Sequence, residues 1–295
     1  MKTCHPSLYY ICVSIILSFL PFQAAAIQPG EVRWHNEQAD TTRITEILVS
    51  ATDANYGSDG ALITAIARTF ICTPYKAATL EGEPEMLTVD LDEMDCTTFV
   101  ENVLAMALTV KERRNAWQDF VYNLGNIRYR QGRMNGYSSR LHYISDWIVD
   151  NSHRGNIVEM TGRLPNSTYT VKTLDYMSTH RDAYPALADS AEYERLKNFE
   201  GGFRSHRFPY LRSSTLMSKW ASQYLQEGDI IAFTTKVKGL DVSHIGIIAM
   251  KADGPHLIHA SSKEGKVTEE TRTLSEYLKK NPAVTGARII RLGSR

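Results

Sequence analysis

The sequence predicts an α+β fold in which a central helix packs against an antiparallel β-sheet. Apolar residues recur at helical spacing after Cys96, from Phe99 to Leu108. Three strand-like runs follow towards the C-terminus, at 226–233, 243–250 and 256–261, with short turns between them. Hydrophobic residues make up 43% of the 295-residue chain, which suffices for one large core.

The first 26 residues have the features of a signal peptide. Lys2 precedes an apolar stretch at 8–22, shorter than a typical membrane-spanning helix, and three alanines at 24–26 form a small-residue cleavage site. We therefore expect an exported protein of the periplasm or cell envelope. A polar, mobile lead-in is expected at 27–44, and a single folded domain at 45–295.

Cysteine usage indicates one reactive thiol. Cys4 and Cys12 leave with the signal peptide, so Cys72 and Cys96 remain and at most one disulfide is possible. Cys72 ends a helix-like apolar run at 61–71, and we expect it to be a small buried residue. An exported protein that keeps an unpaired thiol is expected to use it.

Cys96 occupies the first turn of the central helix, with Asp95 at the N-cap. The positive end of the helix dipole favours a thiolate, and helix-terminal cysteines have pKa values lowered from ~8.5 to as little as ~3.5–7.5. The carboxylate of Asp95 opposes this effect, so a cationic partner is also expected. The alternative is that Cys96 only continues the apolar stripe as a small core residue.

A long insertion, at about 113–225, is expected between this helix and the sheet. It begins with helix-like segments at 114–130 and 138–151. From about 161 to 216 it is rich in proline, glycine and aromatic residues and lacks a long periodic apolar segment. We expect this part to be irregular and to form a wall over the core.

The second of these helices presents a candidate ligand-binding face. Arg140, Tyr143 and Trp147 share one side of it at helical spacing. An arginine next to two aromatic rings suits a carboxylate-bearing ligand with a sugar or peptide body. A solvated arginine beside partly buried rings fits the same spacing.

Two histidines on neighbouring predicted strands are candidates for a proton relay. His244 shares a strand face with Gly246, which is expected to leave space beside the imidazole ring. His259 on the next strand can bind the other ring nitrogen and hold its tautomer, as the third member of a catalytic triad does. Each histidine alone also fits a structural role, but with Cys96 they supply a nucleophile, a base and an orienting group.

Five ordered motifs carry a family resemblance. They are Thr73-Pro74-Tyr75, Asp95-Cys96-Thr97-Thr98-Phe99-Val100, Gly228-Asp229-Ile230-Ile231-Ala232-Phe233, Ser243-His244-Ile245-Gly246-Ile247 and Ile258-His259-Ala260. In this order they resemble the NlpC-type cell-wall cysteine peptidases, a papain-like group. The segments at 98–105 and 140–147 resemble more closely the branch described as N-acetylmuramoyl-L-alanine amidase-like.

The resemblance spans roughly 45–292 and implies a papain-like fold with the nucleophile helix packed on an antiparallel sheet. It implies that Cys96 is the nucleophile, His244 the general base and His259 the residue that orients the base. The implied or candidate substrate-binding residues are Tyr75, Arg140, Tyr143 and Ser243. The usual Asp-Cys-Ser-Gly is replaced by Asp-Cys-Thr-Thr, which indicates a subfamily.

The reaction implied is acyl transfer through a thioester. In the resembled branch the amide joins N-acetylmuramic acid to L-alanine of the peptidoglycan stem peptide. In the broader group it is more often the bond between γ-D-glutamate and the diamino acid, and this alternative stays open. The long insertion leads us to expect soluble muropeptides as substrates rather than intact wall.

Other classes of function are also considered. The chain has 33 basic and 33 acidic side chains, so it lacks the positive field that nucleic acid or an anionic membrane would attract. We expect a monomer without a cofactor or metal. A zinc site using Cys96, His244, His259 and His256 is an alternative that no metal-binding spacing supports. A catalytically silent cell-wall-binding protein and an acyltransferase are further alternatives.

Overall fold

The structure, a computed structural model, describes residues 32–293. The predicted signal peptide at 1–26 lies outside these residues. Within the described part of the chain, no helix has both the length and the apolar character needed to cross a membrane.

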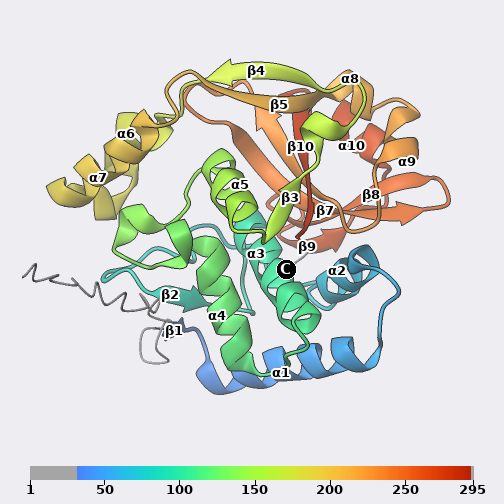
Figure 1. Cartoon of the computed structure of the whole chain (residues 1–295), viewed down its shortest axis with the longest axis horizontal. Coiled ribbons are helices and arrows are strands. Elements are labelled where there is room, and N and C mark those ends of the chain that lie inside the picture. The colour runs from blue at the N-terminus through green and yellow to red at the C-terminus, as the bar shows by residue number, and fades with distance from the viewer. Residues whose placement is uncertain (1–31, 294–295) are drawn as a thin grey trace, which may run out of the picture.

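Groups of consecutive helices and groups of consecutive strands follow one another along the chain (Figure 1). The helices are α1 (Glu37–Asp53), α2 (Asp59–Arg68), α3 (Cys96–Lys111), α4 (Trp117–Arg128), α5 (Ile144–His153), α6 (Tyr176–Thr179), α7 (Ser190–Gly201), α8 (Ser213–Leu216), α9 (Trp220–Tyr224) and α10 (Leu274–Lys279). The strands are β1 (Val32–Trp34), β2 (Leu87–Val89), β3 (Ile157–Glu159), β4 (Thr168–Lys172), β5 (His206–Arg212), β6 (Ile230–Thr235), β7 (Val242–Lys251), β8 (Gly254–Ser261), β9 (Lys266–Glu269) and β10 (Val284–Leu292).

One eight-stranded antiparallel sheet organises the fold. Its strand order is β4-β5-β10-β6-β7-β8-β9, and β3 also pairs with β10. The three C-terminal runs predicted as an antiparallel meander are β6, β7 and β8, which pair in sequence. That prediction is confirmed, because alternating β-branched residues joined by short turns favour hairpins between neighbours in the chain.

Helix α3 runs through the middle of the molecule, between the sheet and helices α1, α2 and α4 (Figure 1). Its residues from Thr98 to Thr109 are all buried, as expected of a helix surrounded on every side by other elements. The helix therefore has a defined position relative to β7 and β8, with which it packs.

Strand β7 separates two hydrophobic cores by the alternation of its side chains. Ile245 and Ile247 belong to the core that contains α3, whereas Ile248 belongs to the core on the opposite side of the sheet. A period of two is what a strand buried on both faces requires. A third, smaller cluster includes Tyr143 and Leu196 and is built largely from the insertion.

The lead-in predicted at 27–44 contains regular secondary structure in its described part. Residues 32–34 form β1, which pairs in parallel with β2, and α1 begins at Glu37. Asp40, buried in the first turn, accepts hydrogen bonds from the backbone of Asn36 at 3.0 Å and of Leu91 at 3.4 Å. A polar segment is thus anchored by a buried carboxylate, which hydropathy does not reveal.

The insertion is more regular than its composition suggested. Strand β5 pairs with β10, β4 pairs with β5, and β3 pairs with β10, so the insertion adds three strands to the sheet. Helix α4 closely matches the predicted segment at 114–130, but the next helix starts at Ile144 and not at 138. The prediction of an irregular wall was wrong here, because the pairing partner lies far away in sequence.

Candidate active site

The start of α3 is built as a capping box around Asp95. Its carboxylate accepts hydrogen bonds from the backbone N–H groups of Thr97 at 2.9 Å and Thr98 at 2.8 Å. The hydroxyl of Thr98 in turn accepts from the Asp95 backbone at 2.9 Å. This geometry confirms the predicted N-cap and puts Cys96 at the first helical position.

The Cys96 thiol lies at the junction of α3 and β7. Its sulfur is within hydrogen-bonding reach of the Ile245 backbone and the Thr97 side chain. Ile245 directly follows His244, so this contact brings the thiol to the strand that carries the candidate base. Cys96 and Cys72 are both free thiols, and Cys96 is half-buried.

The two candidate histidines form a hydrogen-bonded pair. His244 Nε2 and His259 Nδ1 are 2.6 Å apart, and the rings meet edge to face with centroids 4.9 Å apart. His259 is buried, whereas His244 is partly exposed. The contact uses the Nε2 side of His244 and leaves its Nδ1 as the nitrogen that can take up a proton.

Burial favours the neutral forms of the site groups. It raises the pKa of the Cys96 thiol to about 12, and the charge of Asp95 adds to this effect. Burial also lowers the pKa of His244 to about 3, helped by His259, and lowers the pKa of His259 to about 4, helped by Arg272. These pKa directions favour a neutral thiol and neutral imidazoles, whereas the helix dipole alone favours a thiolate.

Tyr75 and Ser243 lie beside these groups. Burial raises the pKa of the Tyr75 hydroxyl, with a further contribution from Cys96, and both residues pack against the same hydrophobic core. Backbone contacts of Tyr75 with Met94 and Gly265 hold it between the approach to α3 and the turn after β8. Ser243 is exposed and sits at the bulge of β7 where pairing with β6 shifts register.

Arg140 and Tyr143 are not displayed on a helix face. Both precede α5, and both are buried. The guanidinium of Arg140 lies 2.9 Å from Glu81 Oε1 and 3.5 Å from Glu85 Oε1. The charge expected to meet a ligand carboxylate is therefore already paired within the protein.

Tyr143 belongs to the third hydrophobic cluster rather than to a ligand surface. Its hydroxyl donates to Glu200 Oε1 at 2.7 Å and accepts from the Met177 backbone at 2.8 Å. The predicted substrate contact is corrected accordingly, because the hydroxyl has both its partners inside the fold. Trp147, the third member of the proposed face, is also buried.

Two further expectations need correction. A Cβ on Gly246 would lie 2.7 Å from Leu257 Cδ1 and 3.1 Å from His259 Cβ, so the expected open space is filled by β8. Cys72 is exposed, not buried, and its φ of 75° places it in the left-handed region. It follows α2, which ends at Arg68.

Sequence reasoning missed three residues that surround the histidines. Phe233 stacks parallel to His244 with centroids 6.1 Å apart, and Tyr277 meets His259 edge to face at 5.6 Å. Glu270 Oε1 is 3.4 Å from His259 Nε2. Phe233 ends one of the five family motifs, at 228–233. The sequence around Glu270 and Tyr277 has no local pattern that would predict their contact with His259.

The described residues do not bring together a metal site. No group of three or more histidine, cysteine, aspartate or glutamate side chains in the range 32–293 is arranged to hold a metal ion. The ring of His256 contacts the Glu270 carbonyl at 2.9 Å and the Asp253 carboxylate at 3.0 Å. Its ring contacts are therefore with Glu270 and Asp253 and not with the rings of His244 and His259.

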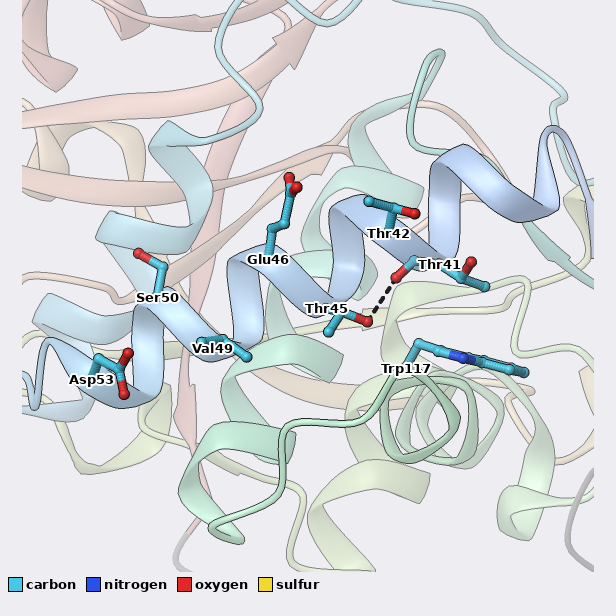
Figure 2. Close-up of a pocket in the computed structure, with 8 residues that line it drawn as sticks. All are labelled: Thr41, Thr42, Thr45, Glu46, Val49, Ser50, Asp53 and Trp117. Atoms are coloured by element: carbon cyan, nitrogen blue, oxygen red, sulfur yellow. Dashed lines mark hydrogen bonds between the residues drawn. The ribbon is translucent and has the colours of Figure 1, made fainter.

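The structure also has a surface groove of about 830 Å³ (Figure 2). One face of α1 and the indole of Trp117 line it, and Thr41, Glu46 and Asp53 are among its polar groups. None of the predicted site residues lines this groove.

The solved structures with the same fold include one named as an N-acetylmuramoyl-L-alanine amidase, the activity of the branch that the sequence resembles. An N-acetylmuramoyl-L-alanine amidase from Bacteroides uniformis ATCC 8492 is 37% identical, with a TM-score of 0.75, over 81% of this chain and all of that chain. A protein from Bacteroides fragilis provisionally named a xylanase is 41% identical, with a TM-score of 0.70, over 77% of this chain and 99% of that one. The α+β architecture with its antiparallel sheet is thus shared with amidase-like structures.

A more distant structure extends the likeness in fold. Protein LPG0564 from Legionella pneumophila str. Philadelphia 1, of the family model DUF1460, is 23% identical, with a TM-score of 0.66, over 88% of this chain and 97% of that one. Comparison with curated proteins finds no significant match. The AmiA-like family model, described as N-acetylmuramoyl-L-alanine amidase-like, matches residues 65–286, from α2 into β10. The chain belongs to this AmiA-like, N-acetylmuramoyl-L-alanine amidase-like family.

Proposed function

We propose that this protein is an exported cysteine amidase that cleaves the amide between N-acetylmuramic acid and L-alanine in peptidoglycan fragments. The observation that carries the proposal is the meeting of Cys96, at the start of α3, with the strand that bears the hydrogen-bonded His244–His259 pair. Family membership and the amidase from Bacteroides uniformis support the choice of bond. The nucleophile helix packed on an antiparallel sheet supports a papain-like, NlpC-type architecture.

In this mechanism His244 acts as the general base. Its Nδ1 takes the proton of Cys96 as the sulfur attacks the amide carbonyl, so charge develops only during the step that needs it. Because the N–H groups of Thr97 and Thr98 bind the Asp95 carboxylate, the backbone N–H of Cys96 is proposed to stabilise the oxyanion. The protonated His244 then gives its proton to the leaving amine of L-alanine, and water hydrolyses the thioester.

His259 holds the ring of His244 through the 2.6 Å contact. When His244 is the donor in that contact, its Nε2 carries the proton and its lone pair lies on Nδ1. Tyr75 and Ser243, which flank the thiol and the base, are proposed to contact the substrate. The substrate is proposed to be a soluble muropeptide in the periplasm or cell envelope, and the enzyme to act as a monomer.

The first experiment identifies the bond that is cut. The protein without residues 1–26 is incubated with a defined disaccharide-tetrapeptide, and the products are identified by mass spectrometry. Release of the intact tetrapeptide supports the amidase. Release of a peptide that begins with the diamino acid instead supports a γ-D-glutamyl-diamino acid endopeptidase, the alternative for which the same nucleophile and base would serve.

Two cysteine variants test the nucleophile. Cys96→Ala is expected to reduce turnover by at least about 10³-fold, because no other group replaces the attacking sulfur. Cys72→Ala is the matched control, since this second free thiol is exposed and is expected to leave turnover unchanged. Full activity in Cys96→Ala would refute the mechanism. Equal rates on purified sacculi and on the muropeptide would refute the preference for soluble fragments.

A further inference from the structure

The second ring nitrogen of His259 faces a carboxylate. His259 Nδ1 contacts His244, which leaves Nε2 to find another partner. This Nε2 is buried and has no hydrogen-bond partner within residues 32–293, but Glu270 Oε1 lies 3.4 Å away. That separation is longer than an ordinary hydrogen bond. Catalytic hydrogen bonds are often long without substrate and shorten in the reacting complex.

Glu270 is held in this position by its own contacts. Its backbone N–H donates to Leu257 O at 2.8 Å, and its carbonyl accepts from His256 Nδ1 at 2.9 Å. Both partners lie on β8, the strand that carries His259. The side chain is only 6% exposed, and Arg272 contacts both carboxylate oxygens at 2.7 to 3.0 Å. Arg272 thus compensates the buried charge and orients the carboxylate.

A carboxylate at this position selects one tautomer of His259. If Nε2 carries the proton, it donates towards Glu270, and Nδ1 becomes an acceptor. His244 must then donate from its Nε2, which leaves Nδ1 of His244 unprotonated. The opposite tautomer would set a lone pair against the carboxylate and would leave the proton of His244 on the nitrogen that is needed as the base.

The carboxylate also balances the charge that the reaction creates. When His244 takes the proton of Cys96, the histidine pair becomes positive inside a buried site, where charge is costly. The groups that face His259 are His244, Glu270, Arg272 and the ring of Tyr277. Of these, Glu270 supplies the negative charge, and Arg272 is paired with that carboxylate.

We propose that Glu270 is a positioning residue that extends the triad to a Cys96–His244–His259–Glu270 series. It holds the Nε2–H tautomer of His259 and draws closer as positive charge develops on the pair. This inference rests on the function proposed above in taking Cys96 and His244 as the reacting groups. The competing explanation is structural, with the Glu270–Arg272 ion pair serving only to connect β9 to α10.

Glu270→Gln separates these explanations, with Glu269→Gln as the matched control. Glu269 is the preceding residue and pairs with Arg68 at 3.0 Å and Lys251 at 3.0 Å, neither of which is part of the proposed series. In Glu270→Gln we expect kcat to fall about 10- to 100-fold with KM within twofold. The acid limb of the kcat profile should also move to lower pH, because the protonated pair loses its counter-charge. In Glu269→Gln neither quantity should change.

A spectroscopic readout does not depend on activity. In protein labelled with 15N-histidine, the ring nitrogens of wild-type His259 should show Nε2 protonated and Nδ1 unprotonated, with the assignment taken from His259→Gln. Glu270→Gln should populate the other tautomer. A wild-type His259 protonated at Nδ1 would overturn the inference even if the variants fail to fold, and so would kcat within twofold of wild type in folded Glu270→Gln.

The same data distinguish failure of the inference from failure of the proposed function. If the wild-type protein does not cleave the muropeptide, the proposed function fails, yet the tautomer of His259 still shows whether Glu270 positions it. If cleavage occurs and the tautomer does not respond to Glu270→Gln, only the role of Glu270 is refuted.

Discussion

Gly246 lies where β7 approaches the backbone of β8 beside the histidine pair. An added Cβ would lie 3.0 Å from Ile258 O and 3.1 Å from His259 Cβ, besides its contact with Leu257. A carbonyl in a paired strand cannot move without disturbing its hydrogen bonds. The residue is therefore needed to let the two histidine-bearing strands pack at this spacing.

We expect Gly246→Ala to lower the free energy of unfolding by about 1–3 kcal/mol, as overpacking does. It should also reduce kcat more than tenfold, because it displaces His259 from His244. Thermal unfolding and muropeptide turnover measure the two effects. Gly201→Ala is the control, since a Cβ there meets nothing within 4 Å. Wild-type activity in Gly246→Ala would show that the His244–His259 contact tolerates strand displacement.

Helix α3 is joined to its neighbours by a buried ion pair. Arg128 Nε on α4 lies 2.6 Å from Glu101 Oε2 on α3, and the two side chains are 2% and 3% exposed. Arg128 also donates to Thr88 O on β2 at 2.6 Å. The pair thus connects the helix that starts at Cys96 with α4 and the two-stranded sheet.

We expect Glu101→Gln to destabilise the fold by about 3–5 kcal/mol, because it leaves the Arg128 charge buried without its counter-ion. Glu101→Gln combined with Arg128→Met should cost less than the sum of the two single changes. Urea unfolding of the two single variants and the double variant measures this coupling. Strict additivity would mean that the two charges are stabilised independently.

Some helices and strands can be predicted from the local sequence pattern alone. The helix at Cys96 and the meander at the C-terminus combine matching periodicity with caps or turns, and both were predicted. The helix expected at 138–151 begins later, at Ile144. The prediction started too early because Leu141 lies at helical spacing from Ile144 although it precedes the helix. Arg140 and Tyr143 instead take extended conformations, which their partners Glu81 and Glu200 stabilise.

At the scale of the whole molecule, partly and fully buried histidines couple the fold to pH. Burial lowers the pKa of His142 and His244 to about 3 and of His259 to about 4. The unfolded chain takes up these protons near pH 6.5, whereas the folded chain does so only near pH 3 to 4. Their contribution to stability is therefore full above pH 6.5 and is lost as the pH falls through this window.

Buried carboxyls with raised pKa values, such as Glu85 and Glu101, act in the opposite direction. Comparison of wild type with His142→Asn isolates the contribution of His142 to the pH dependence of stability, because both proteins contain the same buried carboxyls. We expect the stability difference between wild type and His142→Asn to shift by at least about 1 kcal/mol in favour of the variant between pH 7 and pH 5. Urea unfolding at both values measures it, and a difference that is independent of pH would contradict a buried neutral His142.

The sequence by itself determined the α+β class, the capped helix that begins at Cys96, the three antiparallel strands and the candidates Cys96, His244 and His259. These features depend on periodicity, capping and turn residues, which act within a few positions of the chain. The motifs in their order also indicated the family to which the chain belongs.

Only the tertiary structure decided which polar groups already have partners and which distant segments meet. It buried Tyr143 against Glu200, paired Arg140 with Glu81, exposed Cys72 and brought Glu270 to within 3.4 Å of His259 Nε2. It also added β3, β4 and β5 to the sheet. Such outcomes depend on pairing across long sequence separations, and a local pattern carries no record of the partner that satisfies a buried charge or an open strand edge.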